Sequence, residues 1–288
     1  MIRRLAGMLA ALSALLLNAQ DQPVFRTETR FVEVYTTVHD KKGRALSGLS
    51  QSDFRLQDNG VPQEIVNFEA QDGTLSCAIL LDVTGSMADA LPAVKANVGR
   101  FIEQFRAGDA VAVYSFNDTL KRLQDFTVDH AAARQAVLRT KAGGSTALYD
   151  SISLLARALG ERRGKKAIVV FTDGDDNASV LNAASAVQRA KKDGYPLYII
   201  AEGDALKSKA LLRTLEEMSD STGGKLHSLK SLKDIGRLFE DITAELQHTY
   251  LMTYKPPMNT PGWHTIQVSI NGPEAHQVRS RLGYLALQ

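Results

Sequence analysis

The sequence contains a single cysteine, Cys77, among its 288 residues. A disulfide within the chain needs two cysteines, so the fold must be stabilised by burial of apolar side chains, and the chain is long enough for that. Cys77 lies within an apolar run, far from the N-terminus and without a basic neighbour. We therefore interpret it as a small buried residue rather than a site of lipid attachment or a nucleophile.

Blocks of like charge are also missing from the sequence. The chain has 34 Lys and Arg residues against 32 Asp and Glu, and setting aside Arg3 and Arg4 with the N-terminal leader leaves 32 against 32. A nearly neutral chain without a basic tract does not favour nucleic acid or an anionic membrane surface as a partner. No internal repeat or low-complexity tract is visible.

No apolar run reaches the length of a membrane span. The uncharged run from Leu5 to Leu17 follows a basic start, and it is shorter than the roughly 20 residues that a bilayer requires. We predict a secretory signal peptide over residues 1–19, cleaved after Ala19, and hence a secreted or periplasmic protein without stable membrane insertion after cleavage. An uncleaved N-terminal anchor is the alternative, because Leu17 is larger than the usual residue at its position.

Both flanks of the mature chain show β patterns. Residues 32–38 alternate apolar and polar side chains, and so do residues 266–270. Asn59-Gly60 predicts a hairpin turn between a strand that begins at Phe54 and a return strand at 65–68.

Neither flank alone has enough strands for a stable core. We therefore predict that residues 20–73 and 249–288 pair into one small β-sandwich, with residues 74–248 inserted between them as a separate domain. Trp263 and Tyr254, on either side of Pro256-Pro257, are expected in the core of this sandwich.

Residues 74–248 alternate apolar strands with amphipathic helices. The expected strands are Leu75–Leu81, Ala110–Phe116, Ala167–Thr172, Leu197–Ala201 and a weaker one at Lys225–Leu229. The expected helices are 88–105, 131–139, 148–159, 181–192, 209–219 and 232–246. Continuous apolar strands separated by helices predict an α/β fold, a doubly wound and mostly parallel sheet with helices on both faces.

Polar oxygens follow the first of these strands. Asp82, Thr84 and Ser86 lie in the segment between strand 75–81 and the next helix, with the spacing Asp-x-Thr-x-Ser. In open α/β sheets this edge is where ligands bind. One carboxylate and two hydroxyls form a poor nucleophile–base pair but a suitable partial shell for a hard divalent cation.

Two later segments add oxygens at the same edge. Thr146 lies in a glycine-rich turn that opens the helix at Leu148, and Asp173 follows strand 167–172. Because parallel strands end at one edge of a sheet, these side chains can converge with the first three. Two carboxylates and three hydroxyls, without His or Cys, suit Mg²⁺, Mn²⁺ or Ca²⁺ better than zinc or copper.

With these five residues, the chain resembles a von Willebrand factor type A domain with its metal-ion-dependent adhesion site. The family pattern is Asp-x-Ser-x-Ser, then a distant Thr, then a distant Asp in a Thr-Asp-Gly context. The residues that match it, in order, are Asp82, Thr84, Ser86, Thr146 and Asp173. Thr84 replaces the first Ser of the pattern and keeps its hydroxyl. The resemblance covers about residues 75–247, and the flanks resemble those of secreted bacterial proteins that carry such a domain within β-rich ends.

The resemblance implies a set of roles for these residues. Thr84 and Ser86 would bind the cation directly, while Thr146 and Asp173 would exchange direct and water-mediated contact between states. An acidic side chain of a protein partner would then fill the open coordination position. The implied protein is a non-enzymatic, metal-dependent adhesion module.

Each residue also has a simpler structural interpretation. Asp82, Thr84 and Ser86 taken alone fit helix-capping groups. Asp175 and Asp176 are typical of a solvated acidic loop. The presence of Thr146 and Asp173 is what favours a metal site over capping.

Two other functional classes are alternatives to a binding module. The first is a metal-assisted hydrolase or phosphotransferase using Asp82. Phosphatases of the haloacid-dehalogenase type also place an Asp after an apolar strand, but they need a second Asp two residues on, where this chain has Thr84. No Ser-His-Asp order or phosphate-binding Gly-Lys-Ser/Thr loop is present. An envelope assembly factor remains an alternative that differs from an adhesion module only in its partner.

Overall fold

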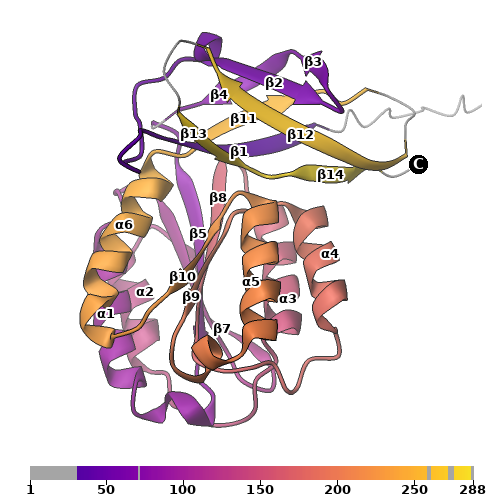
Figure 1. Cartoon of the computed structure of the whole chain (residues 1–288). Coiled ribbons are helices and arrows are strands. Elements are labelled where there is room, and N and C mark those ends of the chain that lie inside the picture. Colours follow the sequence, from indigo (N-terminus) through magenta and orange to yellow (C-terminus); the bar gives the residue numbers. More distant parts are fainter. Residues whose placement is uncertain (1–30, 71, 258–260, 272–275, 287–288) are drawn as a thin grey trace, which may run out of the picture. The chain divides into compact units, whose positions relative to one another are not determined.

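The computed structural model describes residues 31–70, 72–257, 261–271 and 276–286 (Figure 1). The predicted signal peptide, residues 1–19, lies outside the described residues. Among the helices that are described, none has both the length and the apolar character that a membrane span requires.

A six-stranded sheet forms the centre of the α/β part of the chain. Its strand order is β10-β9-β8-β5-β6-β7, and every neighbouring pair is parallel except β6 and β7. The strands are β5 (Leu75–Asp82), β6 (Ala110–Phe116), β7 (Leu120–Thr127), β8 (Lys165–Thr172), β9 (Leu197–Ala201) and β10 (Lys225–Ser228). The predicted α/β fold with a mostly parallel sheet is confirmed.

Helices cover both faces of this sheet, as Figure 1 shows. The helices are α1 (Leu91–Glu103), α2 (His130–Leu138), α3 (Leu148–Gly160), α4 (Ala183–Asp193), α5 (Lys209–Thr222) and α6 (Ile235–Gln247). Helices α1, α2 and α6 share one hydrophobic core with the sheet, and α3, α4 and α5 share the other. Short 3-10 helices precede some of them: η2 (Gly85–Ala88), η3 (Gly203–Lys207) and η4 (Leu232–Asp234).

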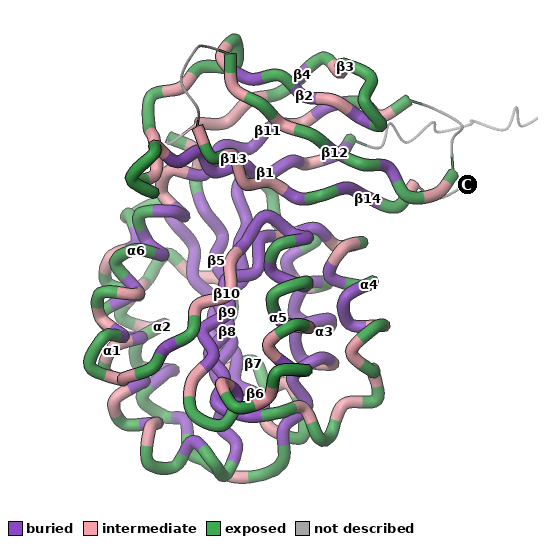
Figure 2. Tube along the Cα trace, viewed as in Figure 1, coloured by how far each residue is buried: buried purple, intermediate pink, exposed green. Residues whose placement is uncertain are grey.

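The apolar run of β5 explains why it lies at the centre. All eight of its residues are buried, as the purple strands of Figure 2 show. Ile79 and Leu81 pack on the face of α1, whereas Ala78 and Leu80 pack on the face of α3. Burial of each such aliphatic side chain contributes about 1.5–3 kcal/mol. A strand with apolar residues on both of its faces is therefore stable only between two helical layers.

Strands from both ends of the chain form a β-sandwich. One sheet has the order β13-β1-β11-β4 and the other β14-β12-β2-β3. The bounds are β1 (Val32–His39), β2 (Phe54–Asp58) after the 3-10 helix η1 (Gln51–Asp53), β3 (Val61–Gln63), β4 (Ile65–Glu69), β11 (Tyr250–Tyr254), β12 (Gly262–Ile270), β13 (Gln277–Ser280) and β14 (Gly283–Ala286). Val34 pairs with Met252 and Leu56 with Val268, so each sheet joins the two flanks. The predicted sandwich of flanking strands is confirmed.

The structure corrects two predictions within the sandwich. The turn at Asn59-Gly60 has positive φ at both residues, but its return strand is β3; β4 joins the other sheet. Trp263 is 41% exposed, because the inward positions of β12 are those of His264 and Ile266. Tyr254 is buried in the sandwich core as expected.

Ion pairs join the sandwich to the α/β part. Lys166, near the start of β8, contacts Glu33 of β1 at 3.0 Å, and Arg279 of β13 contacts Glu245 of α6 at 2.9 Å. These contacts lie at the amino end of β8 and near the carboxyl end of α6. The carboxyl ends of β5, β8 and β9 lie at the opposite edge of the sheet.

Candidate metal centre

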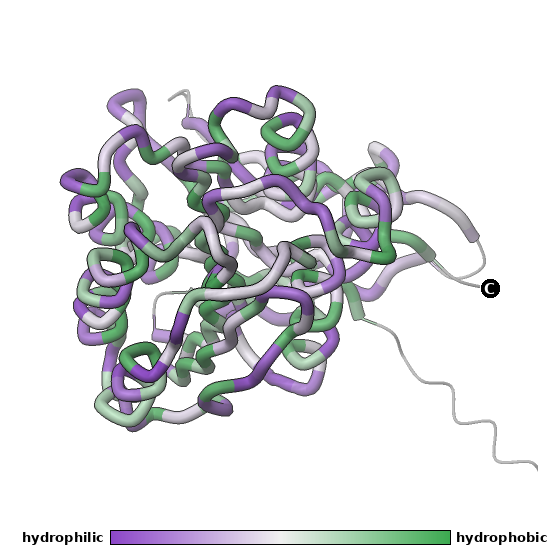
Figure 3. The backbone as a smooth tube through the Cα atoms, turned by 90° about the horizontal axis from the view of Figure 1, so that it is seen from below, coloured by the Kyte–Doolittle hydropathy of each residue, from purple (hydrophilic) through white to green (hydrophobic). Residues whose placement is uncertain are grey.

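The five predicted site residues all lie at the carboxyl edge of the central sheet. Asp82 is the last residue of β5, Thr84 and Ser86 follow it at the start of η2, and Asp173 directly follows β8. Thr146 lies two residues before α3. Figure 3 views the chain from below Figure 1 and so looks onto the loops of this edge.

A continuous set of hydrogen bonds connects four of these residues. The Ser86 hydroxyl donates to Asp173 Oδ1 at 2.9 Å, and the Ser86 and Thr84 hydroxyl oxygens are 3.0 Å apart. Asp82 Oδ1 accepts the backbone N–H of Thr84 at 3.0 Å. The structure therefore brings oxygens from β5, its following loop and the end of β8 into direct contact.

Gly174 shows that Thr146 belongs to the same group. A Cβ atom on Gly174 would lie 3.9 Å from both Ser86 Oγ and Thr146 Oγ1. The two hydroxyls therefore border one small space beside residue 174, which the absence of a side chain keeps open. All five predicted residues converge.

Backbone hydrogen bonds hold the loops of the site together. The Gly143 N–H donates to Val83 O at 2.8 Å and the Gly85 N–H to Gly144 O at 3.2 Å. The side-chain oxygen of Asn177 accepts the Thr146 N–H at 2.8 Å, and the Thr146 carbonyl accepts the Asn177 N–H at 3.0 Å. Three loops distant in sequence thus support one another.

Asp118 and Asp176 have structural roles that the sequence did not reveal. Asp118 accepts the Ser145 N–H at 3.0 Å. Asp176 accepts the Tyr149 N–H at 2.9 Å in the first turn of α3, as well as the Ser179 hydroxyl at 2.6 Å. The prediction of a merely solvated acidic loop was therefore wrong for Asp176, which caps a helix. No local sequence signal identifies this cap, because Asp176 lies 27 residues beyond Tyr149 in the chain.

Burial gives the two carboxyl groups unusual proton affinities. Asp82 is fully buried, and this burial raises its pKa even though the Thr172 hydroxyl donates to Oδ2 at 2.7 Å. Burial, the neighbouring Asp82 carboxylate and Glu202 together raise the pKa of Asp173 to about 6. The Asp82 and Asp173 carboxylates repel each other where little water can screen them, and a cation bound by both would compensate this repulsion.

Glu202 is a third carboxylate at this edge that sequence reasoning missed. It directly follows β9, the strand next to β8, and its N–H donates to Thr172 O at 3.0 Å. The signal was present, because Glu202 follows its apolar strand as Asp82 and Asp173 follow theirs.

The donor chemistry of the site fits a hard divalent cation. Among the described residues, no group of three or more His, Cys, Asp or Glu side chains is placed to hold a metal. An ion at this edge would therefore depend on the hydroxyls of Thr84, Ser86 and Thr146 beside the two aspartates. Such an all-oxygen set with few carboxylates suits Mg²⁺, which retains several waters.

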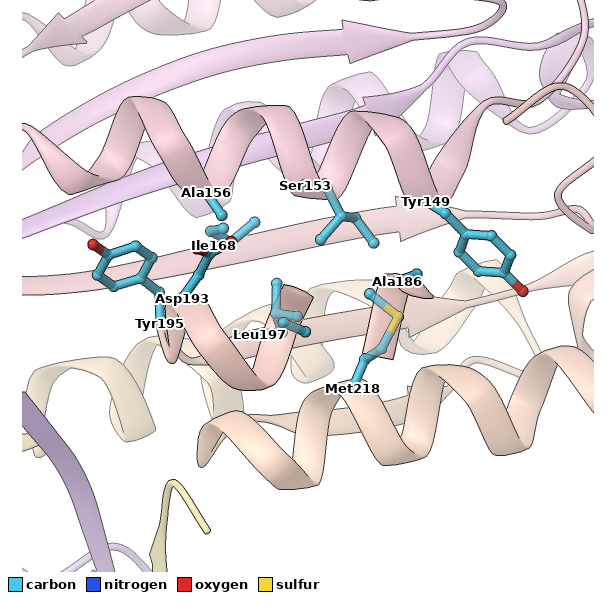
Figure 4. A pocket seen from close by; sticks show the side chains of 11 residues that line it. Tyr149, Ser153, Ala156, Ile168, Ala186, Asp193, Tyr195, Leu197 and Met218 are labelled. Carbon is cyan, nitrogen blue, oxygen red and sulfur yellow. The ribbon is translucent and has the colours of Figure 1, made fainter. Parts of the chain in front are cut away.

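A separate hollow lies between α3, α4 and α5, away from the five residues (Figure 4). Its lining is mainly apolar, with Ile152, Leu197 and Met218 among the residues that border it. Its interior volume is about 10 Å³, which is room for about one water molecule. It therefore offers no space for an organic substrate.

Comparisons with known proteins agree with this architecture. The family model described as von Willebrand factor type A domain matches residues 77–241. No curated protein sequence matches the chain.

Solved structures share the fold at low sequence identity. A von Willebrand factor type A protein from Catenulispora acidiphila is 13% identical with a TM-score of 0.54, covering 91% of this chain and 75% of that one. The PilB minor pilin from Streptococcus sanguinis is 15% identical with a TM-score of 0.52, covering 61% of this chain and 62% of that one. The vWF domain of the type V pili tip protein Mfa5 from Porphyromonas gingivalis is 13% identical with a TM-score of 0.50, covering 59% and 94%. At these identities the likeness is one of fold.

Proposed function

The chain belongs to the von Willebrand factor type A domain family, and from that premise we propose that it is a non-enzymatic binding module that engages a protein partner through a divalent cation. Asp82, Thr84, Ser86, Thr146 and Asp173 would hold the ion, with Mg²⁺ as the expected cation and Mn²⁺ or Ca²⁺ as substitutes. The observation that carries this proposal is the hydrogen-bonded series Thr84–Ser86–Asp173.

The residues of the site have separate tasks in this proposal. Ser86 is exposed and Thr84 is buried behind it, and the buried Asp82 fixes the Thr84 backbone by accepting its N–H. Asp173 holds Ser86 in place through its Oδ1. When bound, the cation would supply a Lewis-acidic position for an acidic side chain of the partner.

Two features of the site favour a binding role over catalysis. Position 84, where a dehalogenase-type phosphatase needs its second Asp, is a Thr whose hydroxyl contacts Ser86. A binding role uses all five residues, whereas a hydrolase using Asp82 would have a nucleophile that is fully buried. These points support the assignment as a non-enzyme.

The proposal extends to the domains and to localisation. We assign residues 1–19 to a signal peptide, 74–248 to the binding domain, and 20–73 with 249–288 to the sandwich that presents it. The setting would be the periplasm or the cell exterior. The pilus tip protein and the minor pilin that share the fold are components of surface structures, which agrees with this setting.

Thermal melting with and without Mg²⁺ tests the proposal. Binding to the folded state alone should raise the melting temperature of the mature chain, by an amount that grows with Mg²⁺ concentration. Ser86→Ala should abolish this rise while leaving the melting temperature in EDTA nearly unchanged, because Ser86 is exposed. An equal rise in wild type and Ser86→Ala would remove the site assignment.

A screen for metal-dependent hydrolysis tests the non-enzymatic assignment. The wild type should show no turnover of phosphate or carboxylic esters above that of Ser86→Ala. Turnover that requires Mg²⁺ and disappears in Asp82→Asn would instead establish an enzyme.

A further inference from the structure

Three acidic residues end adjacent strands at the carboxyl edge of the sheet. The strand order β9-β8-β5 places Glu202, Asp173 and Asp82 at the ends of three adjacent strands. Neighbouring strands are about 4.8 Å apart, so Glu202 lies one strand from Asp173 and two from Asp82.

Register places Glu202 on the same side of the sheet as Asp173. Thr172 pairs with Ala201, so the next positions along the two strands are Asp173 and Glu202. The preceding alternate residues, Phe171 on β8 and Ile200 on β9, pack in the same core. The backbones stay interlocked beyond the ladder, because the Ala205 N–H donates to Asp173 O at 2.8 Å and a Cβ on Gly203 would lie 3.4 Å from Asp173 Cβ.

Three acidic residues near Glu202 have partners of their own, whereas the exposed Asp175, like Glu202, forms no salt bridge among the described residues. Asp204 forms an ion pair with Lys207 at 2.6 Å, Asp176 caps α3, and Asp118 holds the Ser145 N–H. No salt bridge within the described part of the chain includes Glu202, which is half-buried.

The net charge of the site indicates which kind of partner side chain it favours. Asp82, Asp173 and Glu202 carry three negative charges when ionised, so one divalent cation leaves one negative charge uncompensated. A partner carboxylate that joins the cation adds a second negative charge. A positive charge beside that carboxylate would compensate Glu202, and opposite charges that meet across an interface favour one partner over others.

We propose that Glu202 is a second contact point of the site and that it takes a Lys or Arg side chain of the partner, next to the partner's metal-binding Asp or Glu. The partner segment is therefore an acidic residue with a basic neighbour rather than an acidic stretch. This inference rests on the proposed function, because it requires the cation site one strand away.

Selection of peptides tests this inference directly. The probe is a phage-displayed library of disulfide-closed peptides with a fixed central Glu and random neighbours, bound to the full mature chain in Mg²⁺ and released by EDTA. On the wild type, Lys and Arg beside the Glu should be enriched about two- to fivefold over the starting library, as expected for a partly exposed ion pair. On Glu202→Gln this enrichment should disappear.

Glu240→Gln is the matched control, since it removes one exposed glutamate of α6 by the same substitution. Basic residues should be enriched on this variant as on the wild type. The inference is wrong if basic residues are not enriched on the wild type, or if they are enriched equally on the wild type and on Glu202→Gln. If EDTA releases no peptides from the wild type, metal-bridged recognition itself fails, and the proposed function fails with it.

A Mg²⁺ titration separates a docking contact from a metal ligand. Glu202→Gln should weaken Mg²⁺ binding by no more than about fivefold, the effect of one screened charge a strand away. A loss of tenfold or more would show that Glu202 is a metal ligand, and the docking role would be rejected.

Discussion

The Ser86 hydroxyl donates a hydrogen bond of 2.9 Å to Asp173 Oδ1, although the two residues are 87 positions apart in the chain. This contact joins the loop after β5 to the end of β8, and it connects the exposed and buried halves of the candidate site. Ser86 is exposed at the surface, whereas Asp173 is only 6% exposed. The proposed ion at Ser86 would therefore be open to a partner, while the Asp173 carboxylate stays buried.

Two substitutions at Thr84 should separate the contribution of its hydroxyl to Mg²⁺ binding from that of its methyl group. Thr84→Ser keeps the oxygen that lies 3.0 Å from Ser86 Oγ, so we expect Mg²⁺ to bind within about threefold of its wild-type affinity. Thr84→Val keeps the shape and loses the oxygen, and should weaken binding by about tenfold or more, a cost of about 1.4 kcal/mol. Isothermal titration with Mg²⁺ measures both, and equal affinities in the two variants would show that the hydroxyl is not a ligand.

Binding of the cation should depend on pH through Asp173. Its pKa is raised to about 6, so it holds a proton that the cation must displace. The Mg²⁺ affinity should therefore rise as the pH rises from about 5 to about 7 and then level off. An affinity that is flat over this range would show that Asp173 is not part of the site.

The metal-free fold should show the opposite trend. The pKa values of Asp82 and Asp173 are both raised above the 3.8 of an unperturbed aspartate. The folded chain therefore holds protons that the unfolded chain has lost, and stability falls as the pH rises from about 4 to about 6. Urea unfolding in EDTA measures this contribution. Asp173→Asn should reduce the slope in that range, and an unchanged slope would contradict the assignment.

A substitution at Gly174 should weaken Mg²⁺ binding without destabilising the fold. Its Cβ would lie 3.9 Å from the Ser86 and Thr146 hydroxyl oxygens, an ordinary contact that leaves the chain unstrained but fills the space beside them. We expect Gly174→Ala to melt near the wild-type temperature in EDTA and to bind Mg²⁺ about tenfold more weakly. Gly108→Ala, 3.5 Å from Thr74 Cγ2 and far from the site, is the control. If Gly174→Ala binds Mg²⁺ as tightly as the wild type, the ion does not lie beside residue 174.

Asp58 should stabilise the sandwich. Its buried carboxylate accepts the Tyr254 and Tyr284 hydroxyls at 2.8 and 2.9 Å and lies 2.7 Å from His264 Nδ1. Asp58→Ala leaves these buried groups without that acceptor, so unfolding in urea should show a loss of about 3–5 kcal/mol. Asp125→Ala, which breaks an exposed pair with Arg122, should cost less than about 1 kcal/mol. A similarly small loss for Asp58→Ala would show that the cluster adds little stability.

The parts predictable from the sequence are those governed by periodicity. The unbroken apolar runs of β5 and β8 predict a buried parallel sheet, and the polar residues that follow them predict one shared edge. Strand β7 was not predicted, because its sequence does not alternate apolar and polar residues: the exposed Lys121 and Arg122 follow each other directly. Trp263 was misplaced because the register of β12, set by pairing with β2 and β14, turns His264 inward instead.

The supporting residues of the site depend on loop geometry, which periodicity does not describe. Asn177 contacts the turn before α3, and Asp176 its first turn, only because the loop after β8 folds back over Thr146 and Tyr149. Glu202 could have been inferred from its position after an apolar strand, but its place beside Asp173 requires the strand order β9-β8-β5. Order in a sheet follows from the packing of the whole chain and not from any one segment.

We propose that a divalent cation binds between the loops that follow β5 and β8. An anomalous difference map from crystals of the mature chain grown with Mn²⁺ would locate this ion. One strong peak is expected with the Thr84 and Ser86 hydroxyl oxygens about 2.0–2.3 Å away, and with Thr146 and Asp173 beside it directly or through water. A map without a peak there, or with its strongest peak at other residues, would show that these loops do not hold the cation.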